Sequence, residues 1–121
     1  MFAAKTIKKN ELIEICPVIL VKYRTQQHRI NNTPSENILD NYYFDWNKNY
    51  WCFPMGYGTL YNHSYHANAK YVFNHRQKLL KYRAVTLINK DEEITINYNG
   101  TPNDTDSIDS WFVDHHGKKI I

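Results

Sequence analysis

The sequence has few of the residues that mark disulfide-rich, linker-rich or membrane-spanning chains. Its two cysteines, Cys16 and Cys52, are too few and too far apart for a disulfide framework or a Cys-x-x-Cys metal knuckle. Four glycines and four prolines leave no Gly/Ser-rich or Pro-rich linker. The longest apolar run, residues 16–21, is far shorter than the ~20 residues of a membrane-spanning helix. We therefore expect one intracellular domain, residues 1–121, without a membrane span.

Charge is also not concentrated. The net charge is +3, and basic and acidic residues are spread evenly over the two halves of the chain. A nucleic-acid-binding protein would gather its lysines and arginines in one region. A small basic nucleic-acid-binding protein is therefore the weakest interpretation, and we expect no direct contact with nucleic acid.

Aromatic residues are abundant instead. Phe, Trp and Tyr make up 15% of the chain, and ten residues are tyrosine. Disordered chains are depleted in aromatic residues, so we expect a folded domain with its own core.

Short segments with the pattern of β-strands follow one another. The segments that predict strands are 11–21, 70–73, 78–85 and 93–98. The middle two are expected to form a hairpin through a turn at 74–77. The last one alternates, so that Ile94, Ile96 and Tyr98 share one face.

One short helix is expected between the first two strands. Residues 33–36 supply an N-cap, a proline in the first turn and an early acid. Apolar side chains then follow at helical spacing, at Ile38, Leu39, Tyr42 and Tyr43. The predicted class is mostly β, with several small sheets, one or two short helices, and a loop or lid at 100–121.

One pattern occurs twice. Residues 7–15 and 88–96 share three isoleucines, a lysine and a glutamate at a constant offset of 81 residues. We interpret both as a polar turn that feeds a strand, rather than as a gene duplication, with Asn10 and Asp91 tolerating a positive φ.

The densest polar cluster, residues 61–69, is ambiguous by itself. His63 and His66 are spaced to share a metal ion on a helix, but no third ligand follows closely, so we expect no metal site. His63 beside Ser64 lacks the glycine-flanked turn of a nucleophilic serine. The remaining interpretation is that Asn62 and His63 hold a tight chain crossing or a ligand.

Two other motifs have structural interpretations. Gly56-Tyr57-Gly58 is too short for a dinucleotide fingerprint and predicts a turn where backbone segments approach closely. Glu92 and Glu93 are neighbours on an expected strand. Their side chains therefore point to opposite faces and cannot act together on one substrate.

The order of two motifs carries a family resemblance. Asn62-His63-Ser64, followed about thirty residues later by Glu93-Ile94-Thr95-Ile96-Asn97-Tyr98, resembles two segments of the SET-domain lysine methyltransferases. These family segments read N-H-S-x-x-P-N and E-[L/I]-T-x-x-Y. Two ordered motifs are far more specific than either alone.

Flanking segments extend the resemblance to residues 2–112. Residues 2–11 resemble the family's F-A-x-x-x-I-x-x-G-E opening. Residues 40–44 and 56–58 resemble the middle segment of its small viral and bacterial members, and Trp111-Phe112 resembles their aromatic lid. The implied fold is a β-clip, in which small sheets surround a knot-like crossing, a rare kind of connection.

The implied reaction is methyl transfer from S-adenosylmethionine to a lysine amine of a protein substrate, for which a histone-like protein is one candidate. The nucleophile must be neutral, although free lysine has a pKa of ~10.4. A narrow aromatic channel lowers that pKa by desolvation, and tyrosine rings and hydroxyls suit such a channel.

By motif position, the resemblance assigns roles to nine residues. Tyr98 matches the family's catalytic tyrosine. The cofactor-binding positions are Asn62, His63, Tyr42, Trp111 and Phe112. The substrate-channel positions are Tyr57, Tyr71 and Ile96.

Departures from the family pattern lead to a second interpretation of the function. The family's glycine-rich strand would come just before Phe2, and this sequence begins at Met1. A degenerate SET module that binds a protein partner without turnover is therefore the second interpretation. Ile96 stands where many members have Phe or Tyr, which leaves the number of transferred methyl groups open. The resemblance also leaves open a homodimer and a location in the cytoplasm or, for a viral protein, in the host nucleus.

Overall fold

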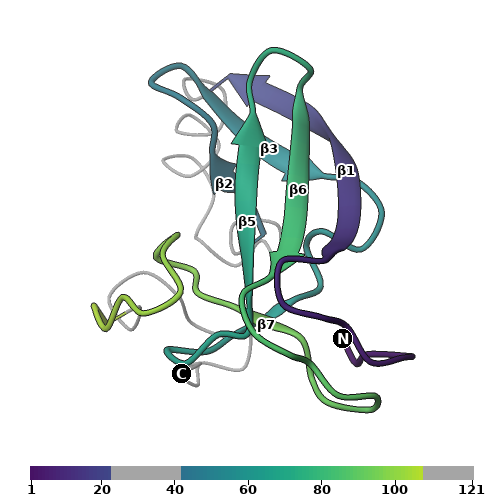
Figure 1. The fold of residues 1–121 in the computed structure, drawn as a ribbon. Coiled ribbons are helices and arrows are strands. Elements are labelled where there is room, and N and C mark those ends of the chain that lie inside the picture. The colour runs from purple at the N-terminus through teal and green to yellow at the C-terminus, as the bar shows by residue number, and fades with distance from the viewer. Residues whose placement is uncertain (23–41, 108–121) are drawn as a thin grey trace, which may run out of the picture.

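The structure is a computed structural model that describes residues 1–22 and 42–107. It contains a five-stranded antiparallel sheet in the order β2-β3-β1-β6-β5 and a parallel pair, β4-β7 (Figure 1). The strands are β1 (Leu12–Lys22), β2 (Phe44–Asp45), β3 (Tyr50–Pro54), β4 (Asn62–His63), β5 (Ala69–Asn74), β6 (Leu79–Ala84) and β7 (Thr95–Ile96). The mostly β class predicted from the sequence is confirmed.

Parts of the expected architecture fall outside the described residues. The helix expected from residue 33 lies mostly there, as does the lid beyond residue 107. Within the part of the chain that the structure describes, no helix is long and apolar enough to cross a membrane.

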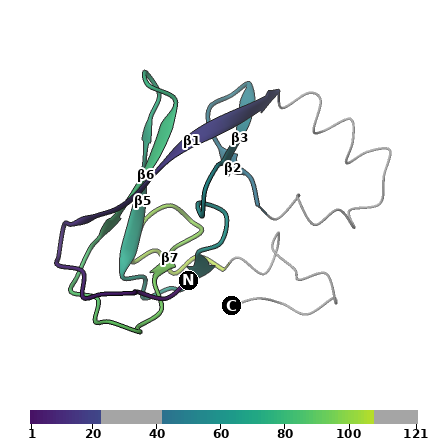
Figure 2. The ribbon, with the colours of Figure 1, turned by 90° about the vertical axis from the view of Figure 1, so that its right-hand side faces the viewer.

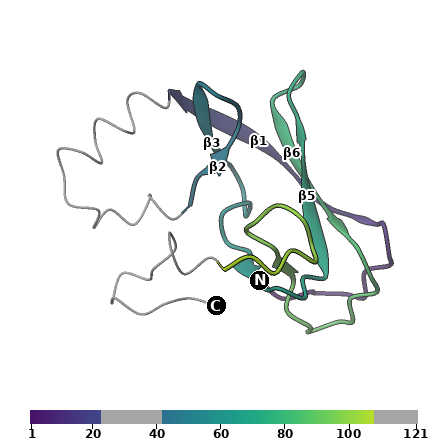
Figure 3. The same cartoon turned by 90° about the vertical axis from the view of Figure 1, so that its left-hand side faces the viewer.

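The long strand β1 joins two halves of the sheet. Its first half pairs with β6, where Cys16 lies opposite Leu80, and its second half pairs with β3, where Leu20 lies opposite Cys52. The register shifts after Leu12, as at a β-bulge, which bends and twists a strand. The sheet therefore curls, and β2 and β3 splay away from the β5–β6 hairpin (Figures 2 and 3).

The hairpin predicted over residues 70–85 is confirmed. β5 and β6 pair in register from Ala69 opposite Ala84 to the turn after Asn74. The side-chain Oδ1 of Asn74 accepts the backbone N–H of Gln77 at 2.9 Å, which closes the turn.

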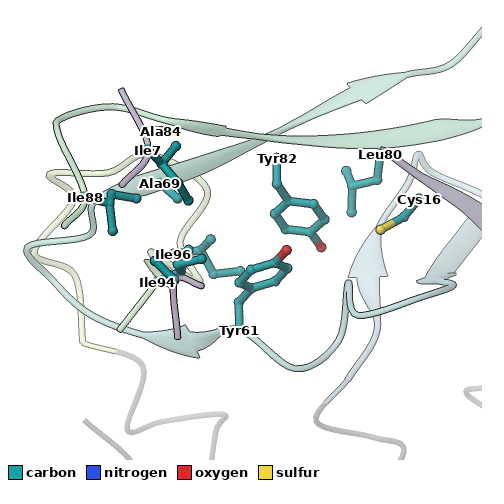
Figure 4. Close-up of a cluster of buried hydrophobic side chains, with 11 residues drawn as sticks. Ile7, Cys16, Tyr61, Ala69, Leu80, Tyr82, Ala84, Ile88, Ile94 and Ile96 are labelled. Carbon is teal, nitrogen blue, oxygen red and sulfur yellow. The ribbon is translucent and has the colours of Figure 1, made fainter. Parts of the chain in front are cut away.

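The inner face of the curled sheet forms the core. Cys16 of β1 and Leu80 and Tyr82 of β6 are fully buried there. Figure 4 shows Tyr82 and Tyr61 approaching each other from opposite sides, and their rings stack at 4.5 Å. The Tyr82 hydroxyl donates to the carbonyl of Gly58 at 2.6 Å, so this buried polar group has a partner.

The glycine-containing loop before β4 is a close backbone approach, as expected. Gly56 has a φ of +67°. A Cβ on Gly58 would lie 2.5 Å from the Cβ of Pro54 and 3.0 Å from the sulfur of Cys16. Only glycine fits there, because a side chain would displace packed atoms of β1 and β3.

The repeated sequence pattern forms the same local structure twice. Asn10 and Asp91 both have a φ of 70°, as predicted. In both turns the following glutamate donates its N–H to the carbonyl three residues earlier, at 3.0 Å; these bonds join Glu11 to Lys8 and Glu92 to Asn89.

The two repeats also pair with each other. Ile7 and Ile88 exchange both backbone hydrogen bonds, at 2.8 and 2.9 Å. The neighbouring backbone hydrogen bonds come in matching pairs, in which each residue of one bond is 81 positions from the corresponding residue of the other. The N–H of Ala3 donates to Glu92 as that of Ala84 donates to Glu11. The N–H of Asp91 donates to Ala3 as that of Asn10 donates to Ala84. The arrangement has a local pseudo-two-fold relation that joins the N-terminal segment to the chain before β7.

Candidate active site

The two sequence motifs lie side by side in the parallel pair β4-β7. Asn62 pairs with Thr95 and His63 pairs with Ile96, and the N–H of Ser64 donates to the carbonyl of Ile96 at 2.9 Å. The pair lies at the foot of the sheet, below β5 in Figure 1. Segments more than thirty residues apart in the sequence therefore form one structural unit.

Asn68 fastens this unit from the side. Its Nδ2 donates to the carbonyl of Glu93 at 2.8 Å, and its Oδ1 accepts the N–H of Thr95 at 2.9 Å. The Asn68 side chain thus makes hydrogen bonds to the β7 segment that a second neighbouring strand would otherwise make. We assigned no role to Asn68 from the sequence, although it occupies the last asparagine of the family segment N-H-S-x-x-P-N.

Asn62 is held at the surface by a charged neighbour. Its Nδ2 donates to the carboxylate of Glu93 at 2.7 Å, and the residue is exposed. A hydrogen bond to a charged acceptor is among the stronger ones, so it fixes the direction in which the amide faces.

His63 is buried and fixes the backbone of the second motif. Its Nδ1 accepts the N–H of Tyr98 at 3.0 Å, which requires an unprotonated Nδ1. The ring packs against the rings of Tyr65 and Tyr98. Among the described residues, its Nε2 is buried without a hydrogen-bond partner. Burial lowers the pKa of His63 below its ordinary 6.5, so the imidazole is neutral at pH 7.

This geometry predicts a stability loss at mildly acidic pH. The unfolded chain binds a proton at His63 below about pH 6.5, whereas the folded chain resists protonation there. The free energy of unfolding should therefore fall as the pH drops from 7.5 to 5. Urea unfolding followed by circular dichroism across this range measures the effect.

Two variants assign that effect to His63. His63→Asn keeps an acceptor near the position of Nδ1 and does not titrate, so its pH dependence should be shallower. His66→Gln removes an exposed histidine and should retain the slope of the unchanged protein. Equal slopes in all three proteins would contradict the assignment.

Tyr98 presents a protonated hydroxyl. Its O–H donates to the carbonyl of Tyr61 at 2.8 Å. Burial, and secondarily Tyr42 and Glu93, raise the pKa of Tyr98 to about 12. The phenol therefore remains neutral at pH 7, and its oxygen retains lone pairs that can accept a hydrogen bond.

Tyr98 and its hydrogen-bond partner Tyr61 both line a pocket of about 730 Å³. It is strongly aromatic, and it is lined by Tyr42, Tyr43, Phe44, Asp45, Gly58, Thr59, Tyr61, Tyr71, Val72, Phe73, Ile96, Tyr98, Asn99 and Gly100. Its volume falls in the range of about 300–1,000 Å³ typical of small-ligand sites. The curl of the sheet builds it, because β2 and β5 supply facing walls, on which the rings of Phe44 and Tyr71 meet at 4.7 Å.

The predicted site residues divide into three groups: those that line the pocket, those that do not, and those outside the described residues. Four of them line the pocket: Tyr42, Tyr71, Ile96 and Tyr98. Asn62 and His63 lie in β4, next to β7, but are not among the lining residues. Tyr57 is also absent from the lining, and 62% of its surface is exposed. Trp111 and Phe112 lie outside the described residues.

Parts of the site had no clear signal in the sequence. Phe44 lies in the segment 40–44 that resembles the family's middle segment, and Phe73 ends a predicted strand, but neither is a predicted site residue. The curl of β1 brings their strands together. Glu14, which is not among the lining residues, also has no signal in the sequence. Its carboxylate accepts the Tyr61 hydroxyl at 2.7 Å and the Tyr57 N–H at 2.9 Å. These two bonds hold the loop that carries Tyr61 against β1.

The pocket suits a cationic guest. Aromatic faces attract cations, and Asp45 adds the one carboxylate among the described lining residues. Burial, followed by Asp45, raises the pKa of Tyr71 to about 12, so this hydroxyl also stays protonated. Residues 1–22 and 42–107 contain no group of three or more His, Cys, Asp or Glu side chains placed to bind a metal ion.

Comparison with known proteins gives a consistent result. Residues 1–99 match the SET domain family. A Schizosaccharomyces pombe histone-lysine N-methyltransferase, specific for lysine 37 of histone H3, is 27% identical over 99 residues. That match covers 81% of this chain and 64% of the relative's length.

A solved structure agrees. The crystal structure of a proposed histone methyltransferase from Plasmodium falciparum superposes with a TM-score of 0.61 at 34% sequence identity. The match covers 83% of this chain and 86% of that one. The family match spans the pseudo-two-fold segments, the β4-β7 pair and Tyr98, so the chain belongs to the SET-domain family.

Proposed function

We propose that the chain is an S-adenosylmethionine-dependent protein-lysine N-methyltransferase. The observation that carries the proposal is the neutral Tyr98 hydroxyl at an aromatic pocket, fixed through its backbone by His63 and through its oxygen by the Tyr61 carbonyl. Membership of the SET-domain family supports the same reaction.

The residues present fit the cofactor. The buried Nε2 of His63 is a polar atom without a described partner, and such atoms in native structures call for an explanation. The aromatic pocket with its carboxylate suits a positively charged sulfonium. As the family motif implies, Asn62 and His63 would hold its amino-acid and adenine ends. When bound, the cofactor supplies an electrophilic methyl group.

The chain's own residues prepare the lysine. Tyr71 and Phe73 would surround the aliphatic stem, and Tyr42 would line both the lysine and the methyl-donor site. The dry environment lowers the pKa of the amine. We assign Tyr98 no role as the base that removes the proton, because burial raises its pKa to about 12 and the phenol keeps its own proton at pH 7. Its oxygen instead accepts a hydrogen bond from the amine and aims the nitrogen lone pair. The displaced proton leaves to solvent.

The substrate is proposed to be a histone-like protein, since the matched Schizosaccharomyces pombe protein is named for histone H3. We expect the chain to bind S-adenosylmethionine with micromolar affinity in a calorimetric titration, and Asn62→Ala to weaken that binding about tenfold. Methyl transfer to histone H3 lysines should be visible by mass spectrometry.

Two outcomes separate the proposal from a non-catalytic SET module. Ser64→Ala alters a neighbouring residue outside the proposed cofactor contacts and should leave the affinity within about twofold. A folded chain that binds no cofactor, or that binds it and methylates no lysine in histone H3 or other protein substrates, would overturn the proposed activity.

A further inference from the structure

The outer face of the sheet, opposite the core and the pocket, carries an exposed apolar column on β1. It consists of Leu12, Ile15, Pro17 and Ile19, whose partners on the neighbouring strands include Arg83, Lys81 and Leu79. Leu12, Ile15 and Ile19 are 38%, 46% and 52% exposed. Exposed apolar patches rimmed by polar residues mark interaction sites.

A cationic column runs beside the apolar one. Lys81 and Arg83 of β6 lie next to Ile15 and Leu12, and Lys70 of β5 lies opposite Arg83. Residues 69–84 contain five Lys or Arg and no Asp or Glu. This local excess is hidden in the even distribution of charge along the sequence.

The lysines and arginine of this cationic column have no acidic partner on strands β1, β5 and β6. Glu14 is the one acidic residue in β1, β5 and β6, and it faces inward, where it accepts the Tyr61 hydroxyl. In the edge-on views the outer side of the upper part of the β5–β6 hairpin is open (Figures 2 and 3). At its lower end the segment before β1 reaches Arg83, whose guanidinium donates to the Asn10 carbonyl at 3.2 Å. Within the described chain, the face is therefore both open and electropositive.

We infer that this face docks an amphipathic helix of a partner protein. Its apolar stripe would cover the β1 column, and carboxylates along one flank would pair with Lys81 and Arg83. Neighbouring strands are about 4.8 Å apart, which matches the step from an apolar stripe to its flank on a helix. Because of the bulge after Leu12, the column from Leu12 to Ile19 is about 20 Å long, which a helix of roughly sixteen residues spans.

Two other occupants fit less well. Nucleic acid would use the cations but would leave the β1 column against phosphate and water, without apolar contact. A second copy joined by two-fold symmetry through this face would bring its own lysines against Lys70 and Lys81. An acidic amphipathic segment satisfies both columns at once.

The probe is a fluorescein-labelled synthetic helix of about sixteen residues, with leucines at i, i+3, i+4 and i+7 and glutamates along one flank. Its affinity for the full chain is measured by fluorescence anisotropy. We expect micromolar binding that weakens with salt, and at least about tenfold weaker binding of a matched peptide with lysines in place of the glutamates.

Variants locate the contact. The double variant K70E/K81E should weaken peptide binding about tenfold, and Ile15→Ser about fivefold. The matched control K5E/K90E makes the same charge change at exposed lysines outside the hairpin and should stay within about twofold. Thermal unfolding of each protein confirms that the variants fold. None of these readouts depends on methyl transfer.

Several results would overturn the inference. These are no binding of the glutamate peptide, equal binding of the lysine peptide, or an equal loss in K5E/K90E. Binding of short duplex DNA that K70E/K81E abolishes, without peptide binding, would make the face a nucleic-acid contact. Dimerisation in analytical ultracentrifugation that Ile15→Ser prevents would instead make a second copy the occupant.

Discussion

Tyr98→Phe should lower kcat for lysine methylation by about two to three orders of magnitude, as expected for loss of a positioned polar group at the reacting centre. The substitution removes the oxygen that we propose accepts a hydrogen bond from the amine. It also removes the 2.8 Å bond to the Tyr61 carbonyl. The free energy of unfolding should fall by only about 1 kcal/mol, the typical net value of one such bond.

The measurement pairs turnover with stability. Initial rates at saturating cofactor and substrate give kcat, and urea unfolding gives the stability of the same preparation. Tyr50→Phe removes a hydroxyl from a β3 tyrosine outside the pocket lining and should leave kcat within about twofold. Full activity in Tyr98→Phe would remove Tyr98 from the catalytic centre.

Among the single variants proposed here, Asn68→Ala should cause the largest loss in the free energy of unfolding. It deletes the hydrogen bonds to the Thr95 N–H and the Glu93 carbonyl and leaves both backbone groups without these partners. Two such bonds and the unsatisfied groups together amount to about 2–4 kcal/mol. Because β7 leads directly to Tyr98, we also expect kcat to fall about tenfold or more.

Two further variants test whether the effect of Asn68→Ala comes from the hydrogen bonds of this side chain or from the loss of any asparagine. Asn68→Asp keeps the acceptor for Thr95 and loses the donor to Glu93, so it should give an intermediate loss of stability and activity. Asn74→Ala deletes an asparagine that closes the hairpin turn, outside the pocket lining, and should cost about 1 kcal/mol without changing kcat. If Asn68→Ala behaves like Asn74→Ala, the side chain does not position the site.

Local features were predictable from the sequence because they depend on neighbouring residues. The positive φ at Asn10 and Asp91 follows from turn chemistry, and the β5–β6 hairpin follows from strand patterns around a polar turn. The order of the two family motifs indicated Tyr98 and its neighbours. The alternation over 93–98, in contrast, predicted a longer strand than the two residues of β7. There the Asn68 side chain takes the place of a strand partner.

The walls of the pocket could not be predicted in this way. Phe44 and Phe73 belong to strands that meet across the pocket only because β1 pairs with β6 in one half and with β3 in the other. A strand pattern specifies which side chains share a face, and it does not specify which strand lies opposite. The same holds for Glu14, whose bonds to Tyr57 and Tyr61 cross more than forty residues of sequence.

The pseudo-two-fold pairing has a consequence for biosynthesis. Its bonds join the first residues of the chain to residues near position 90, and the carbonyl of Met1 accepts the N–H of Ile94. Contacts between residues so far apart in the sequence form late, and on the ribosome the N-terminal segment lacks its partners until residues 84–94 have emerged. A nascent chain stopped before residue 84 lacks all of these bonds, and one stopped before Ile94 still lacks the bond to Met1. Tyr98 is translated only four residues after Ile94. Closure of the N-terminal segment and assembly of the site should thus occur together, once the residues up to Tyr98 have emerged.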